Sequence, residues 1–301
     1  RLLPTAEGQA QFMAAHDLDD FSDFTHIVEE NNLEQRYIAT LDFCFDAARL
    51  RQAMIAGGLQ WSELQSPPIL VVPVWKSPDG ARAWYRDNKW LAGWWDAVAS
   101  YSGLLSLRQL DRNLINERQF RGEDLADANP VKLAAAASLV KAEQIMVVMA
   151  ALDYDGSKPV ITITARLFDK NGQLLTDILY GDQVVLTNLD QDGLDEMRRK
   201  IIAKMDSSWH MANLIDGAVS DYLQVFMPVS SIKDWAKRLT ALNEVAVVQS
   251  YDILSLDTKG GQVVLRLVGS REALGNALAA HKLELVDDDG RLLIKAKPKN
   301  S

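Results

Sequence analysis

Residues 36–45 read RYIATLDFCF, residues 46–57 read DAARLRQAMIAG and residues 69–75 read ILVVPVW, and these three segments decide the fold. The first alternates between two faces, as a β-strand does. Its apolar face carries Tyr37, Ala39, Leu41, Phe43 and Phe45. The second segment has a capping residue, Asp46, and ends at Gly57, so it predicts a helix. The third is continuously apolar, as a strand covered on both faces is. Strand, helix and strand in this order predict an α/β fold.

The pattern along the rest of the chain predicts two domains. Residues 1–219 are expected to form a mixed sheet packed with helices. Its helices are expected at 5–20 and 88–101, from 130 onward and through 194–205, and its strands at 144–152, 160–168 and 173–181. Residues 220–301 show the order strand, helix, strand, strand, helix, strand, which is typical of a ferredoxin-like split-βαβ domain. A further strand is expected at 291–296.

Two local features refine this expectation. The Asn171-Gly172 pair predicts a β-hairpin turn between the last two strands of the first domain. Pro73 lacks an N–H group and is expected to end or bulge the strand that contains it.

The composition excludes several classes of protein. The chain has 301 residues and a formal net charge of -9, and the acidic excess lies before Tyr222. Nucleic-acid binding needs clustered basic residues, and the short group Arg198-Arg199-Lys200 is expected to be a solvated helix face. No run of about 18 apolar residues occurs, so no transmembrane segment is expected. Cys44 is the single cysteine, and it is expected to be buried in its strand.

Residues 36–46, Leu50, the run Gly57-Gly-Leu59 and residues 67–75 resemble a proteobacterial family of exported proteins known as domain of unknown function 2066. The resemblance extends over most of the chain, including Trp90, Trp94 and Trp95. It implies a periplasmic location. The chain begins at Arg1, and a signal sequence is expected to have stood upstream of it.

Residues 141–149 and the hairpin at 169–172 are similar, in a broader way, to envelope modules. These modules are the TolB N-terminal domain, the curli secretion lipoprotein and the penicillin-binding-protein activators. The likeness implies a TolB-N-like first domain and a role in protein–protein contact, by analogy of fold. Cys44 lies inside a predicted strand, so it gives no support for a lipid anchor.

A group of tryptophans is the leading candidate for a binding site. Trp90 and Trp94 are four residues apart and share a helix face, Trp95 lies beside them, and Trp84-Tyr85 precede them. Large aromatic side chains with a polar tip are favoured in binding surfaces. The alternative is that they pack the helix onto the sheet.

No catalytic residue, metal site or cofactor is predicted. There is no Gly-x-Ser-x-Gly turn, phosphate loop or dinucleotide fingerprint. The acidic loop at 189–196 lacks calcium-loop spacing, because Gly193 comes at the fourth position counted from Asp190 and a calcium loop has its glycine at the sixth. The turn at 287–290 is explained as a hairpin. The four histidines, His16, His26, His210 and His281, lack metal-ligand spacing.

The leading hypothesis is therefore a non-catalytic periplasmic adaptor for envelope assembly or maintenance, with an envelope protein as partner. The alternative hypothesis is a carrier or sensor of a lipid or a small apolar molecule, with Trp84, Trp90, Trp94 and Trp95 lining its pocket. A third is an enzyme whose acids and histidines meet only in three dimensions.

Overall fold

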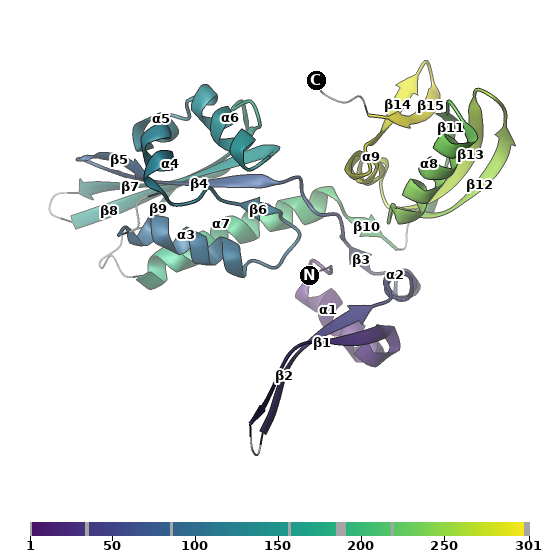
Figure 1. Cartoon of the computed structure of the whole chain (residues 1–301), viewed down its shortest axis with the longest axis horizontal. Helices are drawn as coiled ribbons and strands as arrows, with labels where there is room; N and C mark the ends of the chain where they lie inside the picture. Colours follow the sequence, from purple (N-terminus) through teal and green to yellow (C-terminus); the bar gives the residue numbers. More distant parts are fainter. Residues whose placement is uncertain are drawn as a thin grey trace. The chain divides into compact units, whose positions relative to one another are not determined.

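The computed structural model describes residues 2–33, 36–84, 87–155, 158–184, 191–217 and 220–297. They confirm the predicted α/β mixture of helices and strands and form two compact units (Figure 1). Unit 1 is Arg1–Leu64 with His210–Ser301, and unit 2 is Gln65–Trp209. This division differs from the predicted domains, 1–219 and 220–301. The cause is that apolar side chains of the N-terminal segment, such as Met54 and Trp61, share one core with those of the C-terminal strands.

Unit 2 is built on a mixed sheet with the strand order β5-β4-β7-β8-β9, and the short β6 lies beside β4. The strands are β4 (Ile69–Ser77), β5 (Gly80–Ala83), β6 (Leu107–Arg108), β7 (Gln144–Asp155), β8 (Lys158–Asp169) and β9 (Leu174–Val184). β4 pairs with β7 in parallel, whereas β7, β8 and β9 are antiparallel. β4 continues through Pro73, contrary to the prediction. On the side of β4 away from β7, β6 pairs up to Leu70 and β5 pairs from Val74 onward. Pro73 falls in the gap between these two partners, where the absence of its N–H group is tolerated.

Helices cover both faces of this sheet (Figure 1). They are α3 (Lys89–Ser100), α4 (Leu114–Gln119), α5 (Gly122–Ala126), α6 (Pro130–Leu139) and α7 (Gln191–Ala212). Ile69 and Val71 of β4 pack with side chains of α3 and α7, and Leu70 and Val72 pack with those of α5 and α6. The continuous apolar run of β4 is thus buried on both faces, as predicted.

The predicted turn between β8 and β9 is confirmed. Gly172 has φ +79°, and a Cβ atom there would lie 2.6 Å from Cα of Pro130, so only glycine fits. The Asp169 carboxylate accepts hydrogen bonds from the N–H groups of Gln173 (2.8 Å) and Asn171 (2.9 Å). These bonds hold the pKa of Asp169 below its usual range.

The C-terminal part of unit 1 follows the predicted element order but not the simple ferredoxin-like strand order. Its elements are β11 (Ser220–Pro228), α8 (Ile232–Glu244), β12 (Val248–Leu256), β13 (Gly260–Val268), α9 (Arg271–Ala280), β14 (Leu283–Asp288) and β15 (Arg291–Ala296). The sheet runs β12-β13-β11-β15-β14. The added strand β15 lies inside the sheet, parallel to β11, and β14 takes the edge.

The N-terminal part of unit 1 differs most from expectation. Its elements are α1 (Ala6–Ala15), η1 (Leu18–Phe21), β1 (Ser22–Leu33), β2 (Arg36–Phe45), α2 (Ala47–Ala56) and β3 (Gln60–Trp61), which pairs with β10 (Ile215–Asp216). The helix expected at 5–20 ends at Ala15. β2 and α2 have the predicted bounds within two residues, but β2 does not join the sheet of β4. It pairs with β1, a strand that the sequence analysis missed.

Candidate functional site

The tryptophans predicted as a binding surface lie in the core of unit 2, as two separate pairs. Trp90 and Trp94 pack edge to face on one side of the sheet, with ring centroids 5.6 Å apart. Trp84 and Trp95 are 6.2 Å apart and pack with the cluster on the other side. Trp84, Trp90 and Trp94 are fully buried, and Trp95 is partly buried. The two pairs lie in different core clusters and form no common surface, and their burial favours the packing alternative over a binding surface. Tyr85 lies outside the described residues.

A buried cation, Arg198, lies beside Trp90, although its helix face was expected to be solvated. Arg198 of α7 is 1% exposed and its guanidinium donates to the carbonyl oxygen of Trp90 (3.3 Å) and to the Asp195 carboxylate. Gly93 of α3 makes the space, because a Cβ atom there would lie 2.3 Å from the guanidinium. Arg199 and Lys200 are exposed, as predicted. The basic triplet therefore contributes one residue to packing between helices.

Tyr101 ties the end of α3 to α7. Its hydroxyl donates to the Asp206 carboxylate and accepts from the N–H of Leu105 (3.1 Å). Burial, together with the bond to Asp206, raises the pKa of Tyr101 above its usual range. The Tyr101 hydroxyl, like the Arg198 guanidinium, thus has a structural role within unit 2.

The β1–β2 hairpin is the apolar feature that packing does not explain. In the described chain, β1 and β2 form a sheet of two strands that no third strand joins (Figure 1). They are antiparallel, with Leu41 opposite Ile27 and Phe43 opposite Thr25. The pairing skips Asp23 and Val28, so β1 is the bulged strand and β2 is regular.

The two faces of the hairpin differ in character. Residues opposite each other share a face, and successive residues alternate between faces. One face, called here the apolar hairpin face, carries the apolar residues Ile27, Tyr37, Ala39, Leu41, Phe43 and Phe45. The polar residues Ser22, Thr25 and Glu30 of β1 lie on the same face, and Glu30 accepts a hydrogen bond from the Tyr37 hydroxyl (3.0 Å). The opposite face, called here the mixed face, carries Phe24, His26, Glu29, Arg36, Ile38, Thr40, Asp42 and Cys44. Most of the charged residues of the hairpin thus lie on the mixed face, and Glu30 lies on the apolar hairpin face.

The apolar hairpin face is open to solvent. The exposed fractions are 60% for Tyr37, 55% for Phe43 and 42% for Phe45, and Leu41 and Ile27 are similar. An isolated two-stranded sheet is marginally stable in water, and contiguous exposed apolar side chains mark interaction sites. Cys44, expected to be buried, is only half-buried because its strand has no covering layer. This face is the strongest candidate for a functional surface.

The sequence contained a partial signal for this surface. The alternation at 37–45 identified the apolar face but not its exposure, because a half-buried strand has the same pattern. β1 has a bulge at Val28, and this bulge breaks the alternation by which a strand is recognised.

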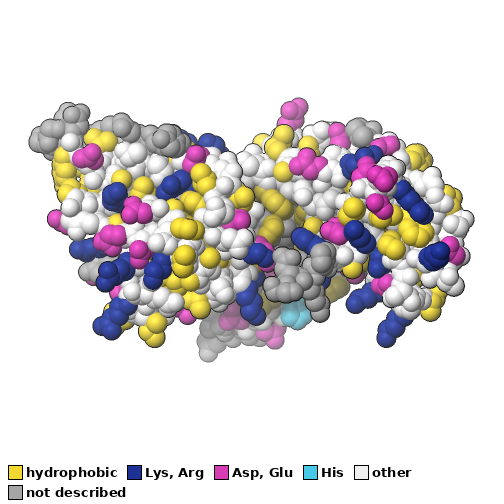
Figure 2. Space-filling model, turned by 90° about the horizontal axis from the view of Figure 1, so that it is seen from above, with side chains coloured by type: hydrophobic (Ala, Val, Ile, Leu, Met, Phe, Trp, Pro, Cys, Tyr) yellow, Lys and Arg dark blue, Asp and Glu magenta, His cyan; other side chains and the backbone are white. Residues whose placement is uncertain are grey.

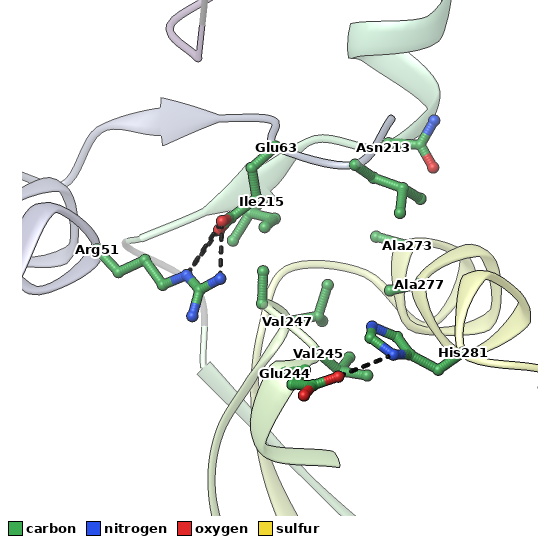
Figure 3. A pocket seen from close by; sticks show the side chains of 12 residues that line it. Arg51, Glu63, Asn213, Ile215, Glu244, Val245, Val247, Ala273, Ala277 and His281 are labelled. Atoms are coloured by element: carbon green, nitrogen blue, oxygen red, sulfur yellow. Dashed lines mark hydrogen bonds and ion pairs between the residues drawn. The ribbon is translucent and has the colours of Figure 1, made fainter. Parts of the chain in front are cut away.

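A second candidate is a small pocket inside unit 1 (Figure 3). Its volume is about 200 Å³, and aliphatic side chains such as Ile215, Val245 and Val247 line it. Figure 3 shows two polar pairs at its sides. Arg51 donates to both carboxylate oxygens of Glu63, at 2.8 to 3.1 Å, and His281 Nδ1 lies 3.4 Å from Glu244 Oε2. Of the four histidines, His281 thus lies at a pocket.

Two further hollows lie in the described residues, one beside Arg82 and Glu123 in unit 2 and one beside Trp235 and Leu256 in unit 1. Figure 2 shows basic and acidic side chains interspersed on the face in view. Within the described residues, no group of three His, Cys, Asp or Glu side chains is arranged to hold a metal ion. Leu189 and Asp190, which begin the acidic loop considered as a calcium site, lie outside the described residues. In the same described part of the chain, no helix has the length and hydropathy to cross a membrane.

Solved structures of two other proteins have a low similarity to this chain. Neither a scan against protein-family models nor a search of curated proteins found a match. Among solved structures, the lipoprotein GNA1162 from Neisseria meningitidis is 17% identical with a TM-score of 0.29, covering 46% of this chain and 98% of that one. The hypothetical protein CT253 from Chlamydia trachomatis is 15% identical with a TM-score of 0.27, covering 47% and 96%. TM-scores this low transfer no property to this chain, and the resemblance to domain of unknown function 2066 stays a prediction.

Proposed function

We propose that this protein is a non-catalytic adaptor in the periplasm of a proteobacterium and that it acts by protein–protein contact through the apolar hairpin face. The observation that carries the proposal is the exposure of Tyr37, Leu41 and Phe43 on a sheet of two strands. Covering these side chains removes apolar area from water and adds the layer that the hairpin lacks. The periplasmic address rests on the resemblance to exported proteins.

The charge of the hairpin favours a protein over a lipid surface as the partner. Within 22–33 and 36–45, the acids are Asp23, Glu29, Glu30 and Asp42, and the only Lys or Arg is Arg36. Anionic bilayers attract basic segments and repel acidic ones. A partner with an apolar patch and a basic rim fits this charge pattern.

Site-specific photocrosslinking in intact cells tests the proposal. A benzophenone amino acid placed at Phe43 lies on the apolar hairpin face, and the same probe at Thr40 lies on the opposite face of the same strand. We expect a discrete protein adduct from position 43 and little from position 40. Equal adducts from both positions, or none from 43 while the protein is folded and exported, would contradict docking through this face.

A second candidate function, carriage of a small apolar molecule, is favoured by the unit 1 pocket that Ile215, Val245 and Val247 line. Its volume of about 200 Å³ lies below the ~300–1,000 Å³ of common ligand pockets, so a small ligand fits better than a lipid. Native mass spectrometry of the purified chain tests this function. A bound mass that disappears in Ala277→Trp, which fills the pocket, would support carriage, and a ligand-free spectrum would oppose it.

A further inference from the structure

The free edge of β2 differs from that of β1. Natural sheet edges are usually protected by lysine, proline, bulges or short strands. β1 has two bulges, whereas β2 is regular over Arg36–Phe45 and contains no Lys, Pro or Gly. No third strand pairs with β2 in the described chain. Its outer edge is therefore an unprotected row of backbone donors and acceptors, rich in aromatic and β-branched residues.

We propose that a second copy of this chain pairs with the outer edge of β2, antiparallel about a two-fold axis, to form a four-stranded sheet β1-β2-β2-β1. A two-fold axis closes the assembly at two copies, because each β2 edge satisfies the other. Four strands also replace a sheet of two, which is marginal by itself.

The side-chain pattern selects one register. The apolar face of β2 carries its odd-numbered residues. The apolar faces of the two copies therefore lie on the same side only if odd-numbered residues of one copy pair with odd-numbered residues of the other. If the two-fold axis passes beside Leu41, Tyr37 of each copy lies opposite Phe45 of the other copy. This is an aromatic pair of the kind that stabilises sheets.

Charge complementarity supports the same register. Centring on Leu41 places Arg36, at the tip of the hairpin, opposite Asp46 of the second copy, at the base of its hairpin. Asp46 caps α2 through one oxygen, which accepts from the N–H groups of Ala48 and Arg49, and its other oxygen lies 3.3 Å from Arg49. Centring on Asp42 would place two like charges together, and centring on Thr40 would place Asp42 opposite Ile38.

Edge pairing also changes the exposed apolar surface. Aromatic side chains bury ~200 Å² each, so the exposed fractions of Tyr37, Phe43 and Phe45 amount to about 300 Å² on one hairpin. Edge pairing leaves these faces uncovered but joins two of them into one continuous surface of about twice the area.

Cysteine crosslinking of the full chain tests the register. In Leu41→Cys with Cys44→Ser, the two copies of position 41 face each other across the axis, at ~4.5–5.5 Å between Cα atoms. This separation lies within the range of a disulfide. We expect a covalent dimer on mild oxidation. The matched control is Ile27→Cys with Cys44→Ser, which lies on the same face with similar exposure but on β1. It should stay monomeric, and equal crosslinking of both variants would overturn edge pairing.

A spin label on the native Cys44 tests the same geometry without a substitution. Cys44 falls opposite Ile38 of the second copy, so the two labelled positions are six residues apart along the sheet, at about 20 Å. A dipolar distance near this value supports the register. A monomer by sedimentation, with no dipolar coupling, overturns the proposal. Both measurements use the purified chain alone, so their result is separate from the crosslinking that tests docking of a partner.

Discussion

Trp90 and Trp94 of α3, called here the tryptophan layer, and the β1–β2 hairpin are both rich in large apolar side chains. The tryptophan layer is buried, whereas the hairpin is exposed. Trp90 and Trp94 have no exposed surface, whereas Phe43 and Tyr37 are more than half exposed. Two covering layers exist for α3, since the sheet and α7 pack against it. Among the residues that the structure describes, each strand of the hairpin pairs only with the other, and the side chains of β2 are mostly exposed. The comparison shows that aromatic content alone does not locate a binding surface.

Truncation of a layer tryptophan should have the largest effect on stability. Replacing a fully buried aromatic with alanine leaves a cavity, so Trp94→Ala should lower the free energy of unfolding by about 3–5 kcal/mol. Urea denaturation followed by circular dichroism measures this change. A loss below about 1 kcal/mol would mean that the layer is not packed as described.

Overpacking of the same layer should have the next largest effect. Gly93→Ala places a methyl group in the space held by the Arg198 guanidinium, and we expect a loss of about 1–3 kcal/mol. Arg198→Met provides the control, because in that background the added methyl group should cost much less. Equal costs in both backgrounds would contradict a direct clash with Arg198.

Loss of the Tyr101 hydroxyl should have a smaller effect and change the pH dependence. Tyr101→Phe removes a hydrogen bond to Asp206, at a cost of about 1 kcal/mol at neutral pH. The raised pKa of Tyr101 means that the unfolded chain loses this proton first, at about pH 10. Stability should therefore fall as pH rises above about 10 in the native protein, and this part of the fall should be absent in the variant. Denaturation midpoints between neutral and alkaline pH measure the difference, and identical pH profiles would refute it.

Substitution on the hairpin should have the smallest effect on folding. Phe43→Ser removes an exposed side chain, so the free energy of unfolding should change by no more than about 0.5 kcal/mol. With the benzophenone probe moved to Leu41 on the same face, the Phe43→Ser substitution should weaken the partner adduct. A loss of stability similar to that of Trp94→Ala would remove the contrast between the two regions and show that the hairpin is covered within the chain.

The helices and strands that depend on short-range patterns were predictable from the sequence. α2 begins after Asp46 and α6 begins at Pro130, and both signals lie in adjacent residues. The turn at Gly172 and the apolar run of β4 were likewise recognised. β1 was missed because its bulges break the alternation, and β15 entered the sheet interior because strand order depends on contacts between distant segments.

The candidate site was predictable only in part. The alternation at 37–45 showed that Leu41 and Phe43 share an apolar face, but an apolar face in water and one against a core have the same pattern. The tryptophans left a similar choice open, because residues that suit a binding surface also suit a core.

The type of most helices and strands follows from the sequence, since backbone propensity, capping and side-chain period act over a few neighbouring residues. Which apolar face is covered depends on the tertiary structure: Trp90 lies against a sheet assembled from distant strands, and Phe43 does not. Burial is a property of contacts between segments far apart in the chain, and the tertiary fold alone brings those segments together or leaves a face open to water.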